Sequence, residues 1–323
     1  MRDKYIDYLK GFLIFLVVWG HAYRGQGGFF WLIFRFHMPL FFIISGYLFN
    51  NKRKFWSFTK HKFNTLIIPY IIYFLIAYIL TMLFINEVSL IDAIKAFILQ
   101  GKYLDIIFSW SLWYLPFFFL ASIIFYPMSK IKDNKWLILI TCILFLLTVP
   151  TYKLFDKLFV DEFFPLSLQA LPGALGYMSV GLLYNRYKDR IKIPYKYLAI
   201  LVTFLFFVGI GILMVTTKSQ IIKINTYRYV AGSLLIIPFI ILITKDNHNK
   251  IIEYLGKNSL VILGLHSILI HILKRRGGYD YLLSTKLSSE CVFLLVTIFV
   301  IFIVCLFNEV NLYLKNKVYK KTY

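Results

Sequence analysis

The sequence predicts an all-α integral membrane protein with about ten transmembrane helices and both termini in the cytoplasm. Of its 323 residues, 60% are hydrophobic, and Phe and Tyr alone number 33 and 24. Apolar runs long enough to cross the roughly 30 Å hydrocarbon core of a bilayer recur along the whole chain. Because no long polar segment separates these runs, we expect a single membrane domain over residues 1–323.

The apolar runs define ten candidate spans in order along the chain. Their ranges are 8–22, 31–49, 66–85, 111–127, 136–149, 168–184, 197–215, 229–244, 258–273 and 291–312. The fifth is short, so the number of spans is fixed only to within one or two. Two loop segments, 89–100 and 152–159, have apolar residues at helical spacing with charges between them, which predicts helices lying at the membrane surface.

The basic residues predict the orientation of these spans. The chain holds 36 Lys and Arg against 15 Asp and Glu, an excess that would also suit a nucleic-acid-binding protein. With the N-terminus inside, however, 22 of the 36 fall in cytoplasmic segments and 12 in outer loops. This positive-inside asymmetry predicts cytoplasmic termini, and it assigns the excess to topology and anionic lipids rather than to nucleic acid.

The first span, DYLKGFLIFLVVWGHAY, contains two residues that are costly to bury in hydrocarbon, Lys10 and His21. At about 100° and 1.5 Å per residue, eleven residues return to within about 20° of the same face after a rise of roughly 16 Å. Lys10 and His21 therefore share a stripe, which Ile14 and Val18 complete. Such a stripe faces a partner helix or a water-filled cavity. A purely structural alternative is that Lys10 reaches the inner interface and His21 makes one interhelical hydrogen bond.

The second span contains FRFHMPLFFIISGYLF and places Arg35 and His37 within its first two turns, at about the depth of His21. Two imidazoles and a guanidinium are therefore expected to meet in one hairpin. Pro39 leaves backbone groups near His37 without helical hydrogen bonds. These three side chains are candidate catalytic residues, and the alternative is an interfacial cluster without chemistry.

These two segments resemble the opening of the membrane-bound acyltransferase-3 family, whose members O-acylate bacterial cell-surface glycans. That family's first helix has Arg, ten residues, then His, and here Lys10 and His21 occupy the two positions. Lysine keeps the charge and lacks the bidentate fork of arginine. The resemblance continues through KHKFNTLIIPY (60–70), SLWYLPFFF (111–119) and GKNSLVILGLHSILIHIL (256–273).

The resemblance implies an acyl-CoA-dependent O-acyltransferase of the bacterial cytoplasmic membrane, with acetyl-CoA as the expected donor and no metal. The acceptor would be a hydroxyl of a glycan or a lipid-linked sugar. The donor phosphates would lie against Lys10, Lys60 and Lys62. The rise of roughly 16 Å from the first of these to the histidine of the same helix is comparable to the pantetheine arm.

The same resemblance assigns roles near the other end of the first helix. His21 would act as general base on the sugar hydroxyl, or carry the acyl group itself. Arg35 or His37 would orient that base or stabilise the oxyanion. His266 is also expected to contact the acceptor. The aromatic rings of Trp113 and Tyr114 would stack on its sugar ring, and the alternative is that they anchor a helix at the membrane interface.

Two other classes of function are compatible with ten spans and buried imidazoles. A transporter would use His21, Arg35 and His37 as a proton or substrate relay. The absence of a detectable internal repeat and of paired helices broken by Gly or Pro argues against it. A glycan-export partner without chemistry would tolerate replacement of His21.

Overall fold

The computed structural model describes residues 4–23, 28–84, 87–158, 165–190, 195–214, 227–245, 247–285 and 287–321, and in this part of the chain every regular element is helical. The elements are α1 (Lys4–Ala22), α2 (Gly28–Tyr47), α3 (Phe55–Lys62), η1 (Phe63–Ile67), α4 (Ile68–Phe84), α5 (Leu90–Leu99), η2 (Gly101–Asp105), η3 (Trp110–Trp113), α6 (Tyr114–Ser129), α7 (Asn134–Leu158), η5 (Pro165–Ala170), α8 (Leu171–Tyr187), η6 (Lys188–Arg190), α9 (Tyr195–Met214), α10 (Tyr227–Thr244), α11 (Lys250–Lys257), α12 (Ser259–Arg275), α13 (Gly278–Leu283) and α14 (Ser289–Lys321).

Each of the ten predicted spans coincides with one of these helices, and the all-α class is confirmed. Within the described ranges, five segments are long and apolar enough to cross a membrane, and α11 with α12, bent by 83°, allows a sixth. Shorter apolar stretches lie in α2, α9 and α10. Together these helices indicate a multi-pass membrane protein. The number ten and the location of the termini stay predictions.

The two predicted surface helices have different outcomes. Segment 89–100 contains α5, whose N-terminus is capped by Ser89 Oγ accepting from the Asp92 N–H at 3.1 Å. The prediction of a separate helix at 152–159 was wrong, because α7 continues through Pro150 to Leu158.

A tertiary contact explains why α7 passes through a proline. Pro150 has no N–H to donate to the carbonyl of Leu146 four residues earlier. The hydroxyl of Tyr227, from the start of α10, donates to that carbonyl at 2.8 Å. The fold thereby supplies the missing donor from a residue distant in sequence, and the helix continues.

Two pairs of glycines let α1 and α2 approach other helices at backbone distance. A Cβ at Gly46 of α2 would lie 1.8 Å from the Met178 carbonyl oxygen of α8, and a Cβ at Gly181 would lie 1.9 Å from that of Ile43. Gly11 of α1 and Gly256 of α11 form an equivalent crossing. Such close packing by small residues is typical of helix pairs in membranes.

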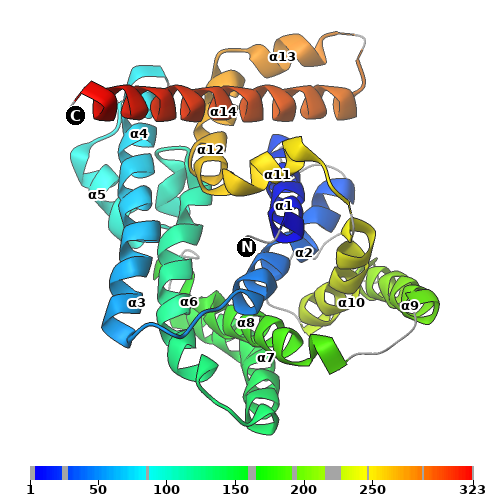
Figure 1. Cartoon of the computed structure of the whole chain (residues 1–323). Helices are drawn as coiled ribbons and strands as arrows, with labels where there is room; N and C mark the ends of the chain where they lie inside the picture. The colour runs from blue at the N-terminus through cyan, green and yellow to red at the C-terminus, as the bar shows by residue number, and fades with distance from the viewer. Residues whose placement is uncertain are drawn as a thin grey trace.

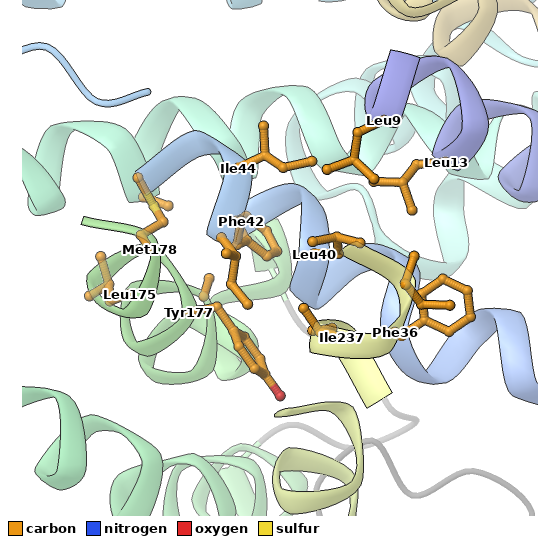
Figure 2. Packing of buried hydrophobic residues seen from close by; sticks show 14 of the residues in the cluster. Leu9, Leu13, Phe36, Leu40, Phe42, Ile44, Leu175, Tyr177, Met178 and Ile237 are labelled. Carbon is orange, nitrogen blue, oxygen red and sulfur yellow. The ribbon is translucent and has the colours of Figure 1, made fainter. Parts of the chain in front are cut away.

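The largest core cluster packs α1 and α2 against α6, α8 and α10 (Figure 1). Figure 2 shows Leu9 and Leu13 of α1 near Leu40 of α2, and Phe42 of α2 facing Met178 of α8. Because α1 and α2 are held by this core on one side and by the glycine crossings, the polar stripe of α1 has a fixed direction.

Candidate active site

A cavity of about 810 Å³ lies between α1, α2, α6, α8, α10 and α12. From α1 it is lined by Lys10, Ile14, Val17 and His21, so the stripe predicted from helical periodicity faces this cavity. The fourth residue of this face is Val17 and not the predicted Val18. Val18 is completely buried in a neighbouring apolar cluster. Lys10 and His21 of one helix therefore line the same cavity.

One end of the cavity, which we call the cationic end, is lined by Lys10, Arg53 and Lys62. The ammonium of Lys62 lies 5.0 Å from the centre of the Phe118 ring, an arrangement typical of a cation–π contact. Among the described lining residues there is no Asp or Glu. The cationic end therefore has the charge needed to hold an anion.

The cationic residues that line the cavity differ from those predicted from the sequence. Lys60 is exposed and does not line the cavity. Arg53 does line it, and sequence reasoning did not single it out. The available signal was its position in the basic segment NNKRKFWSFTKHK, where no residue pattern distinguishes the cations that turn inward.

At the other end of the cavity, the histidine end, His21 meets His266 of α12. The His21 Nδ1 atom lies 3.3 Å from His266 Nε2, and His266 Nδ1 lies 2.8 Å from the carbonyl oxygen of Ile262. A carbonyl oxygen only accepts, so His266 Nδ1 carries the proton and its Nε2 is an acceptor. His21 Nδ1 then donates, and His21 Nε2 holds a lone pair.

The two paired histidines differ in burial and in their contact with the cavity. His21 is partly buried and lines the cavity, whereas His266 is completely buried and does not. His266 therefore reaches the cavity only through His21. The arrangement matches that of a general base whose tautomer is set by a second group behind it.

His37 also lines the cavity and has the same tautomer, because its Nδ1 lies 2.8 Å from the Ile33 carbonyl oxygen. The Phe34 ring stacks on His21 at 5.5 Å between centroids and meets His37 edge-on at 4.9 Å. Arg35 is buried and does not line the cavity, and it lies close enough to Tyr229 to interact electrostatically. The predicted hairpin thus brings both imidazoles, but not the guanidinium, to the cavity wall.

Trp113 and Tyr114 both line the cavity. Tyr114 stacks on Phe118 with centroids 5.4 Å apart and also contacts Phe42, and Trp113 packs on Phe117. These rings form an apolar section of the cavity wall, and one of them, Phe118, lies under the Lys62 ammonium.

Comparison with known proteins identifies the family of the chain. Residues 3–309 match the acyltransferase-3 family, described as "Acyltransferase domain". The chain belongs to the acyltransferase-3 family. It is also similar to the Nodulation protein NolL of Sinorhizobium fredii (strain NBRC 101917 / NGR234), at 50% identity over 58 residues. That match covers 15% of this chain and 16% of NolL, and no solved structure matches.

Family membership gives the cavity a chemical context. In this acyltransferase-3 protein, His21 lines the same cavity as three cationic side chains. The described residues include no group of three or more His, Cys, Asp or Glu side chains placed to hold a metal ion.

Proposed function

We propose that this protein transfers an acyl group from acyl-CoA to a hydroxyl of a glycan or lipid-linked sugar. One observation carries the proposal: a single cavity of about 810 Å³ joins Lys10, Arg53 and Lys62 to His21. A donor with an anionic head and a reactive thioester at the end of a long arm has this distribution of charge. Acetyl-CoA is the donor that we expect, in keeping with the family resemblance.

The donor would lie along α1. Its phosphates would contact the cationic end, and its uncharged arm would pass Ile14 and Val17. The helical rise of roughly 16 Å from Lys10 to His21 brings the thioester to the imidazole. The apolar rings that line the cavity would keep water from the thioester.

The reaction then needs one base and no covalent enzyme intermediate. His21 Nε2 takes the proton of the acceptor hydroxyl while its oxygen attacks the thioester carbonyl carbon. The tetrahedral intermediate collapses, the carbon–sulfur bond breaks, and the thiolate of CoA takes the proton back from His21. His37, whose Nε2 is also an acceptor, would orient the attacking hydroxyl.

The donor site is tested by replacing Lys10 in protein reconstituted in lipid nanodiscs. Loss of one charge-assisted contact removes about 1.5–3 kcal/mol of donor binding, so Lys10→Ala is expected to raise the KM for acetyl-CoA roughly 10- to 150-fold. Turnover at saturating donor should change little, because the contact forms equally in ground and transition states. CoA release is followed at one fixed concentration of glycan extracted from cells lacking the gene.

Two further variants sharpen this test. Lys10→Arg should restore donor binding, because guanidinium engages phosphate through two parallel hydrogen bonds. Lys60→Ala is the matched control, since Lys60 is exposed outside the cavity and its loss should leave the KM unchanged. An unaltered donor KM in Lys10→Ala would remove Lys10 from the donor site.

Orientation decides the direction of transfer, and cysteine labelling measures it. In a variant without native cysteines, single cysteines at the exposed positions Lys54 and Lys132 should be shielded from an impermeant maleimide in intact cells. A cysteine at exposed Ser288 should react, and lysed cells should label all three. Labelling of the first two from outside would reverse the orientation and place the cationic end away from the cytoplasm.

A further inference from the structure

Part of the cavity wall near the histidine end is made of neutral polar side chains with no role in the reaction described above. They come from four elements, α7, η5, α8 and α10. We call this set the polar pocket: Thr148, Tyr152, Ser167, Gln169, Tyr177 and Tyr229.

The polar pocket adjoins the two imidazoles. The Tyr229 hydroxyl donates to the carbonyl oxygen of Phe34 at 3.3 Å, and the Phe34 ring contacts both His21 and His37. The phenols of Tyr152, Tyr177 and Tyr229 lie close enough to one another to interact electrostatically. A ligand in the polar pocket therefore lies beside the proposed base.

Gln169 is the side chain in the polar pocket that most clearly indicates a ligand. It is only 9% exposed, it lines the cavity, and its Oε1 atom has no hydrogen-bond partner. Buried polar atoms in folded proteins are paired in the great majority of cases, because an unpaired one loses its hydration without replacement. A ligand hydroxyl would supply the missing donor.

Tyr177 offers an acceptor in the same place. Its hydroxyl lies 2.6 Å from Ser233 Oγ, and Ser233 Oγ donates to the Val230 carbonyl oxygen at 2.9 Å. Since that bond uses the only serine proton, Tyr177 donates to Ser233, and its own oxygen keeps lone pairs. Figure 2 shows the Tyr177 hydroxyl directed out of the apolar cluster that holds its ring.

The backbone before Gln169 is held in an unfavourable conformation. Leu166 and Ser167 have φ of 53° and 54°, in the left-handed region that residues with a Cβ rarely adopt. Strain of this kind persists where surrounding structure enforces it, and it is concentrated at binding and active sites. Ser167, one of these two residues, lines the cavity together with Gln169.

We propose that the polar pocket binds the acceptor as a neutral sugar ring, with Gln169 and Tyr177 accepting hydrogen bonds from its hydroxyls. This inference rests on the proposed acyl transfer and names the acceptor's site and charge. Sugar hydroxyls donate as well as accept, so unpaired acceptors beside hydroxyl donors complement them. The cavity thereby divides into a cationic end for an anionic donor and a neutral end for an uncharged acceptor.

Binding without turnover tests the polar pocket separately from catalysis. Equilibrium dialysis measures radiolabelled methyl glycosides of glucose, galactose, rhamnose and N-acetylglucosamine against the His21→Ala protein in nanodiscs. At least one neutral glycoside should bind, and adding Gln169→Leu or Tyr177→Phe should weaken it tenfold or more. Tyr184→Phe is the matched control, because Tyr184 is exposed on the same helix α8 and lies outside the cavity wall.

The outcomes separate the two proposals. Absence of binding for all four glycosides, or binding that both variants leave unchanged, would overturn the polar pocket. So would variants that weaken acetyl-CoA binding equally. Specific loss of glycoside binding in a protein that never releases CoA with any acceptor would support the polar pocket and contradict acyl transfer.

Discussion

Replacing His21 with alanine is expected to lower acyl transfer by about 10²–10⁴-fold, the usual loss when a general base is removed. The expectation follows from the position of His21, which lines the cavity opposite the cations and whose Nε2 holds the lone pair. Because the side chain is partly buried and not part of a glycine crossing, the variant should insert and fold. CoA release by purified, reconstituted protein measures the effect.

His271→Ala is the matched control for this experiment. His271 belongs to α12, packs on Phe108 and Trp110, and does not line the cavity. Its replacement should leave at least half of the turnover. Retention of more than a tenth of wild-type turnover in His21→Ala, at normal protein yield, would exclude His21 as the base. His37 would then be the candidate base.

Helical periodicity was sufficient to predict much of the fold and one wall of the site. The 3.6-residue repeat placed Lys10, Ile14 and His21 on one face, and the cavity lies on that face. The one wrong member of the predicted face is Val18, because its neighbour Val17 lines the cavity. Apolar run lengths likewise located every predicted span on a helix, because each run is bounded by polar connections.

The parts of the site that sequence reasoning missed depend on contacts between distant segments. Gln169 of η5 and Tyr229 of α10 carry no local motif, and tertiary packing brings them to the wall of one cavity. Arg53 lines the cavity and Lys60 of the same basic segment does not. This difference depends on tertiary packing. The continuation of α7 likewise depends on Tyr227, which is 81 residues from the carbonyl that it binds.

His266 was expected from the resemblance to contact the acceptor, and its completely buried position behind His21 favours a positioning role instead. Its Nε2 accepts a hydrogen bond from the Nδ1–H of His21, which leaves the lone pair of His21 on Nε2. Removing the group that fixes a catalytic tautomer in a serine protease triad lowers turnover by roughly 10⁴-fold. For a neutral imidazole in this role we expect a smaller loss, of roughly 10²-fold or more.

The two variants His266→Leu and His266→Gln distinguish positioning from packing. Leucine fills space without accepting a hydrogen bond, so His21 can adopt the other tautomer, and turnover should fall by roughly 10²-fold with the donor KM unchanged. Glutamine can donate to the Ile262 carbonyl through its amide nitrogen and accept from His21 through its oxygen, so it should recover at least a tenth of wild-type turnover. Kinetics of CoA release at varied acetyl-CoA, together with protein yield, measure both effects. Equal impairment by leucine and glutamine, or a loss confined to yield, would assign His266 to packing alone.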